Sequence, residues 1–371
     1  MVAGMTTNGD AGYLAYSDSI EQLQPDEAGL VDNILASMLR VNRSVSDRHR
    51  HGLRDAHAKS HGIVKGELVV ADLPAPLNQG MFAMPGIYPV IVRFSTAPGD
   101  LQGDRVPTPR GMAIKVIGVK GEKLLPDDDS RNQDLLLVNH PVIPFGHVKA
   151  YWETQQLLEK GDGSPEALLR VAAAVARGAS QLLKAAHVDV PAALQAIGSA
   201  NTHILGETFH SMAALRYGDH VAKLSAAPLS DGVRALTGQA LPHELGDHAL
   251  RAVVVEYFRT HGAEYQIRAQ LCTNLTEMPV EDASVEWPEA ASAHQPIARL
   301  VLPPQNAYSD ARRIYADDVL SFSPWRGLAE HRPLGSIMRI RRAAYEQSSK
   351  LRHAMNVTPR TEPHDISVLP D

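Results

Sequence analysis

Short β-rich runs separated by turn residues constrain this chain more than any other feature. Four of them follow one another between residues 62 and 140, namely GIVKGELVVADL, YPVIVRFST, GMAIKVIGVKG and QDLLLVN. Because Gly, Pro and Asp fill the intervals, consecutive runs can fold back on each other as neighbouring antiparallel strands. Similar runs return within 207–228, 263–274 and 297–304. The pattern predicts an antiparallel meander or barrel.

Helical segments interrupt these runs. Apolar residues recur at helical spacing over 26–43, and further helices are expected within 145–200, near 250–261 and over 334–350. Residues 1–25 are polar and contain Gly, Ser and Asp, so we expect a loose N-terminal tail. No internal repeat and no Gly/Ser-rich linker divides the rest, which predicts one domain over residues 26–371.

Composition and charge exclude several classes of protein. Lys plus Arg is 36 and Asp plus Glu is 42, a net charge of −6, which argues against a nucleic-acid or anionic membrane partner. A single cysteine, Cys272, allows neither an intramolecular disulfide nor a cysteine metal cage. The N-terminus lacks the pattern of a secretory signal, and no apolar run is long enough to span a bilayer. The expected compartment is the cytoplasm.

The densest polar cluster is RHRHGLRDAHAKSHG, residues 48–62. It holds His49, His51, His57 and His61, and on a helix the last two would share a face and could bind zinc. No third ligand is spaced convincingly, and a solvated basic turn is a simpler explanation. A third interpretation depends on two clusters further along the chain.

The second and third clusters pair a basic residue with a hydroxyl. Arg93 and Ser95 are two apart at a strand end, so both point to one face, and Ser95 could orient the ring of His57. Arg341 and Tyr345 are four apart on an expected helix, which places the guanidinium beside the phenol. A fixed positive charge favours phenolate, an anionic ligand suited to ferric iron, although a simple surface pair would give the same spacing.

Taken in order, these clusters resemble the motifs of the haem catalase superfamily. The first is Arg54-Asp-Ala-His57-Ala-Lys, which looks like the distal-histidine segment of that family. The later matches are RFST at 93–96, TPRGMA at 108–113, the strand end from Asp134 through Asn139 to Pro141, FSP at 322–324, Arg341 to Tyr345, and Arg352. The chain is therefore identified, by resemblance, as a minimal and divergent catalase-related protein.

The resemblance implies an α+β fold with a catalase-like antiparallel β-barrel and helical insertions. It implies haem b between His57 and Tyr345, with Tyr345 as the iron ligand. His57 would act as general base and then general acid on a peroxide, Ser95 would orient it, and Asn139 would donate a hydrogen bond to the peroxide. Arg341 would keep Tyr345 anionic. The haem propionates would be neutralised by Arg54, Arg93 and Arg352.

Several positions depart from the family pattern. Ala56 stands where catalases have Val and coral-type allene oxide synthases have Thr, and Thr108 replaces a channel Asp. Ala343 and Gln347 replace a Phe and an Asp around the axial tyrosine. Since 26 residues follow Tyr345, we expect the C-terminal helical domain of ordinary catalases to be absent. The aromatic residue that stacks on haem is left open between Phe145 and Tyr151.

Three functions are compatible with the sequence. The first is a haem-dependent peroxidase or catalase that reduces organic hydroperoxides or hydrogen peroxide through an oxidised ferryl haem, with an external reductant. The second is a fatty-acid-hydroperoxide rearranging enzyme of the allene oxide synthase kind. The third is a non-haem metal-binding or carrier protein that uses the histidines of residues 48–62. A homodimer or homotetramer is expected from the resemblance.

Overall fold

The β-strands form one antiparallel sheet. A computed structural model of the chain describes residues 12–105, 107–160 and 201–371. The strands of these residues are β1 (Ser60–Val70), β2 (Gly86–Thr96), β3 (Arg110–Ile117), β4 (Asn132–Val138), β5 (Phe209–His210), β6 (Leu215–Tyr217), β7 (His220–Pro228), β8 (Ala263–Leu271) and β9 (Gln295–Leu302).

The sheet closes into an eight-stranded barrel. Its order is β5-β4-β3-β2-β1-β9-β8-β7-β6, and β5 also pairs with β7. The two-residue strand β5 joins β4 through Val138 and His210, and joins β7 through Phe209 and Ala226. β6 forms a hairpin with β7 outside the closed ring. The antiparallel barrel expected from the sequence is therefore confirmed.

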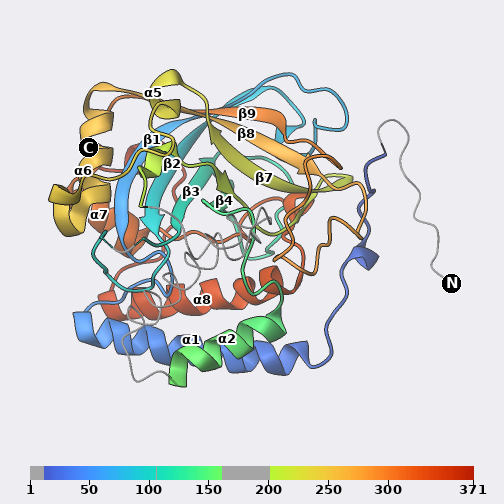
Figure 1. Cartoon of the computed structure of the whole chain (residues 1–371), viewed down its shortest axis with the longest axis horizontal. Coiled ribbons are helices and arrows are strands. Elements are labelled where there is room, and N and C mark those ends of the chain that lie inside the picture. The colour runs from blue at the N-terminus through green and yellow to red at the C-terminus, as the bar shows by residue number, and fades with distance from the viewer. Residues whose placement is uncertain (1–11, 106, 161–200) are drawn as a thin grey trace, which may run out of the picture.

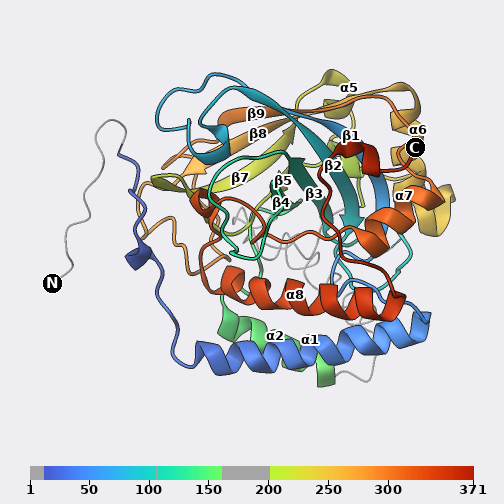
Figure 2. The ribbon, with the colours of Figure 1, turned by 180° about the vertical axis from the view of Figure 1, so that it is seen from behind.

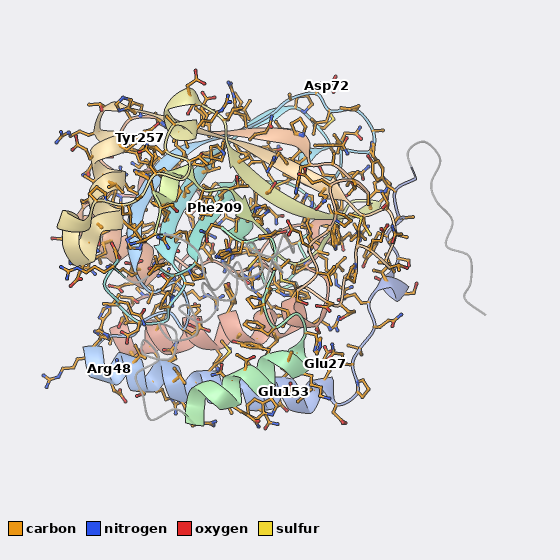
Figure 3. The ribbon with its side chains drawn as sticks, in the orientation of Figure 1. Glu27, Arg48, Asp72, Glu153, Phe209 and Tyr257 are labelled. Carbon is orange, nitrogen blue, oxygen red and sulfur yellow. The ribbon has the colours of Figure 1, made fainter. Side chains whose placement is uncertain are left out.

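Alternating apolar side chains fill the barrel. Val92 and Phe94 of β2 and Met112 of β3 are fully buried in the main core, as strand periodicity requires of an inward face. Phe209 of β5 lies at the centre of the molecule in Figure 3, with its ring 6.3 Å from that of Phe94. Figure 3 also shows Asp72, an exposed residue, at the outer edge. The residues that alternate with this core on β2 face outward, which leaves them free to line a site.

Three helices form a layer beneath the barrel, visible from both sides in Figures 1 and 2. They are α1, α2 and α8, and Ile34, Val148 and Ile340 pack together between them. The helices are α1 (Glu27–His49), α2 (Val148–Lys160), α5 (Asp231–Arg234), α6 (Ala249–Thr260), α7 (Asp310–Ile314), α8 (Ser336–Asn356) and the π-helical turn η5 (Tyr315–Val319). Short 3₁₀ turns are η1 (Asp18–Ile20), η2 (Gly80–Phe82), η3 (Ile204–Gly206), η4 (His243–His248), η6 (Ala329–His331) and η7 (Ile366–Val368).

The expected helices are present where the structure describes them. α1 and α8 run past the boundaries expected from the sequence, and α2 covers the start of the helical stretch expected over 145–200, whose later part lies outside the described residues. No helix in the described part of the chain has the length and apolarity needed to cross a bilayer.

The N-terminal segment departs from the expected loose tail in its described part. Residues 12–25 run along the barrel, where the amide of Leu14 donates to Cys272 O over 2.8 Å and the amide of Tyr16 donates to Asp219 O. The side chains of Leu14 and Ile20 are buried in a cluster with Trp287. These apolar residues are too sparse for a periodic pattern, which is why the sequence did not reveal the packing.

Candidate functional site

One face of α8 carries polar side chains toward the barrel. The spacing i, i+4, i+7, i+8 and i+11 places five residues along one side of a helix. These residues, Arg341, Tyr345, Ser348, Ser349 and Arg352, all line a single cavity between α8 and the barrel.

The barrel side of this cavity is built from two cross-strand rows. Residues paired across antiparallel strands share a face of the sheet. The side chains in the rows through Arg93 and Ser95 therefore point to one face, and the core residues Val92 and Phe94 point to the other. The rows are Arg93, Ala113 and Leu136, and Ser95, Gly111 and Val138. All six residues line the cavity.

The cavity is partly open to solvent, and the space not filled by protein atoms in it, solvent included, is about 670 Å³. The rest of the wall comes from the loop before β1 and the loop after η5, through Arg54, Asp55, Ala56, His57, Ser321 and Phe322, together with Met112 and Leu137 of the strands. The motif residues that the sequence places far apart are thus brought together, with one exception described below.

His57 is held in place by its backbone and by Ser95. Its amide donates to Ala97 O over 2.9 Å, and its φ of +56° is the left-handed conformation that few residues other than glycine adopt. The ring Nδ1 lies 3.0 Å from Ser95 Oγ, the contact that the sequence predicted. Ser95 therefore fixes the ring and leaves Nε2 available to the cavity.

The cavity keeps His57 neutral. Burial lowers the pKa of His57 to about 3, and the positive charges of Arg93, Arg341 and Arg54 add to the effect. A neutral imidazole can accept a proton from a ligand at any pH well above that value. His57, the general base predicted from the sequence, is thus in the unprotonated form that a base needs.

Tyr345 and Arg341 form the contact expected from their spacing. Arg341 Nη2 donates to the phenolic oxygen of Tyr345 over 2.7 Å, and its guanidinium lies 5.1 Å from the ring centroid. The phenolic oxygen of Tyr345 thus has a charged hydrogen-bond donor in direct contact.

Arg54, Arg93 and Arg352 converge on the turn η5. Arg93 and Arg54 contact the carboxylate of Asp317, while Arg352 Nη1 donates to the carbonyls of Asp317 and Asp318 over 2.6 and 2.7 Å. All three guanidinium groups line the cavity. Arg352 Nε is buried without a hydrogen-bond partner, so the cluster has donor capacity that the described residues do not use.

Asn139 directly follows β4 and is not among the residues that line the cavity, and its hydrogen bond to peroxide stays a prediction. Its Oδ1 accepts a 2.7 Å hydrogen bond from the amide of Arg110, which leaves Nδ2 as a donor. The physical reason for this hydrogen bond is that the strand end leaves this amide without a ladder partner, and the asparagine side chain satisfies it. Thr108 is also outside the cavity wall, so its difference from the family Asp does not act directly there.

The two candidate stacking aromatics contact each other instead of the cavity. The rings of Phe145 and Tyr151 stack at 4.4 Å with an interplanar angle of 12°. Neither lines the cavity. Burial raises the pKa of Tyr151, and the charges of Asp55 and Tyr345 add to this, so Tyr151 lies near the α8 side of the site.

The four histidines of residues 48–62 do not converge. Each has a different neighbour: His49 Nε2 lies 2.6 Å from Asp100, His51 Nε2 lies 2.8 Å from Asp318, His57 contacts Ser95, and His61 Nε2 lies 3.2 Å from Thr96. In the described ranges no group of three or more His, Cys, Asp or Glu side chains is arranged to hold a metal ion. This arrangement weakens the non-haem metal hypothesis.

The residues present fit a haem group. Tyr345 supplies an oxygen ligand with a positive neighbour, and Ala113, Leu136 and Phe322 provide apolar wall for a flat ring system. The arginines that line the cavity supply positive charge for acidic groups of a ligand.

Three residues of the site were missed by the sequence analysis. Gly111 allows the close approach of β3 to His57, and a glycine immediately after an arginine at a strand start was a signal for it. Asp55 lines the cavity, and burial raises its pKa. Asp317 joins the arginines, and nothing in the run YADDV distinguishes it from a surface acid.

Solved structures share this fold. No family model and no curated protein matches the chain. A fungal catalase is 16% identical with a TM-score of 0.56, over 84% of this chain and 60% of its own. Catalase A from Saccharomyces cerevisiae is 15% identical with a TM-score of 0.57, over 85% of this chain and 65% of its own. A bacterial catalase is 13% identical with a TM-score of 0.57, over 87% of this chain and 63% of its own.

These similarities define a catalase-related fold. The chain spans 60–65% of the length of the three catalases. At identities of 13–16% the likeness concerns the fold, so the activity has to be argued from the cavity itself.

Proposed function

We propose that this chain binds haem b in the cavity between α8 and the barrel and reduces peroxides there. The observation that carries the proposal is that His57 and Tyr345 line one cavity, although they lie almost 300 residues apart in the sequence. Ser95 contacts the ring of His57, and Arg341 donates a hydrogen bond to Tyr345. We propose further that residues 26–371 act as one haem-binding domain, with hydroperoxide and an external reductant as its substrates.

On the barrel side, His57 performs the proton transfer. Its neutral Nε2 accepts the proton of an incoming peroxide, and the same nitrogen returns it to the oxygen that leaves as water or alcohol. The contact of Nδ1 with Ser95 keeps the ring from turning during this exchange. Ala56 is exposed on the cavity wall beside His57, which leaves room for a hydroperoxide with a bulky organic group.

On the helix side, Tyr345 and the arginines hold the cofactor. Tyr345 binds the iron, Arg341 stabilises the phenolate, and Arg54, Arg93 and Arg352 bind the propionates. Bound haem supplies an iron centre that a peroxide oxidises by two electrons and a donor then reduces. An anionic ligand favours the oxidised state of the iron, so the Arg341–Tyr345 pair tunes the site toward this chemistry.

The test uses haem-loaded protein, cumene hydroperoxide and an aromatic electron donor. A peroxidase converts the hydroperoxide to its alcohol and oxidises the donor in a fixed ratio, two electrons for each hydroperoxide. A parallel assay uses an unsaturated fatty-acid hydroperoxide, and its conversion to an isomeric product without donor oxidation would instead indicate the rearranging enzyme. Absence of any reaction with haem bound would overturn the proposed function.

A further inference from the structure

The arginine cluster contains a carboxylate at its centre. Arg54 comes from the loop before β1, Arg93 from β2 and Arg352 from α8. Arg93 contacts Asp317 Oδ1 through Nε at 2.9 Å and Nη2 at 2.8 Å, and Arg54 Nη1 reaches the same oxygen at 3.4 Å. The carbonyl of Asp317 accepts from Arg54 at 3.0 Å and from Arg352 at 2.6 Å. One residue thus contacts all three cations.

Without an opposing charge this cluster would be unstable. Arg93 and Arg352 are each 2% exposed. Burial lowers the pKa of Arg54 well below its usual range, and Arg352 and Arg93 lower it further. Three cations taken out of water repel one another and lose hydration, which folding tolerates only where an anion compensates.

The Asp317 carboxylate is in direct contact with two of the guanidinium groups, those of Arg93 and Arg54. Burial acts to raise its pKa, but Arg93 and Arg54 outweigh that effect and lower it, so the carboxylate stays ionised. The neighbouring Asp318 directs its side chain to His51 at 2.8 Å and to Asn356 at 3.3 Å. Its charge favours the cationic form of Arg54 and Arg352 from further away.

The guanidinium groups outnumber the acids beside them. Four arginines line the cavity, Arg54, Arg93, Arg341 and Arg352. The acidic residues near them are Asp317, Asp318 and Asp55, and burial raises the pKa of the Asp55 carboxyl group. The excess of positive charge suits an acidic ligand.

We infer that Asp317 is the resident counter-ion of this cluster. It stabilises the guanidinium groups at the cavity before a ligand is bound, and it limits the positive charge that the cluster presents to an acidic ligand. The identity of that ligand as haem rests on the proposed function, but the counter-ion role does not.

The first experiment uses haem-free protein. Asp317→Asn should lower the midpoint of thermal unfolding by about 5 °C or more, since it removes the carboxylate that contacts the buried cations Arg93 and Arg54. Asp318→Asn is the matched control and should cost clearly less. Adding Arg54→Gln to Asp317→Asn restores the charge balance, so the double variant should recover part of the loss.

The result that overturns the inference is equal destabilisation by Asp317→Asn and Asp318→Asn, with no recovery in the double variant. If Asp317→Asn cannot be isolated, the double variant with Arg54→Gln tests the counter-ion role. A folded double variant supports that role, because a purely packing role for Asp317 would leave the double variant unfolded as well. These measurements need no haem, so their outcome is independent of the proposed function.

The second experiment measures ligand selection. Haem and haem dimethyl ester, which lacks the two acidic groups, are bound to the wild-type protein and to Asp317→Asn. Loss of Asp317 should raise the preference for haem over the ester by about tenfold, because a nearby negative charge no longer repels the acidic groups. An unchanged preference would contradict the role in selection. Failure of the wild-type protein to bind either compound would instead contradict the proposed function.

Discussion

Replacing Gly111 by alanine tests how the barrel positions the proposed base. A Cβ at this position would lie 2.5 Å from His57 Nδ1, 2.6 Å from its Cε1 and 2.9 Å from Ser95 Oγ. Ordinary van der Waals contact begins near 3.4 Å. The His57 ring must therefore retreat by about 0.9 Å, from 2.5 to 3.4 Å, or β3 must move away.

The expected effect falls on catalysis more than on haem binding. A displacement of about 1 Å in a catalytic group lowers the rate by about 10²-fold. Overpacking of this kind costs about 1–3 kcal/mol of folding stability, which a domain of this size can tolerate. Tyr345 and the arginines are untouched, so haem should still bind in a one-to-one ratio.

Stopped-flow absorbance of haem-loaded protein mixed with hydroperoxide measures the effect. Gly29→Ala in α1 is the matched control, because a Cβ there meets nothing within 4 Å. A wild-type rate in Gly111→Ala protein that retains haem would refute the claim that this close contact positions His57.

Four further outcomes are expected. His57→Ala should retain haem and react with peroxide about 10²–10⁴-fold more slowly. In the wild-type protein the pKa of His57 is lowered to about 3, so kcat/KM should show no loss near pH 6.5 as the pH falls from 8 to 5. Arg341→Leu should bind haem but release it more readily in acid, since a proton then competes better with iron for the Tyr345 oxygen; release that matches wild type across the pH range would contradict this. Ala56→Val should shift the kcat/KM preference from cumene hydroperoxide toward hydrogen peroxide, and an unchanged ratio would show that this side chain does not control access.

The β-rich runs and the turn residues between them made the barrel predictable from the sequence. Runs such as 88–96 are rich in β-branched and aromatic residues, and Gly, Pro and Asp separate consecutive runs, so antiparallel pairing follows. The closing strand β5 has two residues, Phe209 and His210, and no local pattern marks so short a strand. Closure depends on pairing between residues distant in the chain, which single-sequence periodicity does not contain.

Within the site, contacts set by local spacing were predictable and contacts set by tertiary packing were not. Arg341 and Tyr345 meet because they are four apart on a helix. The side chain of Asn139 accepts a hydrogen bond from the amide of Arg110 on β3, a contact that local spacing does not reveal. Asp317 approaches Arg93 only once η5 folds against β2, so its role depends on distant parts of the chain.

A haem titration of the purified protein and of Tyr345→Phe tests the central claim most directly. The account predicts that the wild-type protein binds haem in a one-to-one ratio and gives the absorption spectrum of tyrosine-ligated ferric haem. It predicts that Tyr345→Phe either fails to retain haem or shows a different ligand class. An identical spectrum and affinity in Tyr345→Phe, or no haem binding by the wild-type protein, would contradict it.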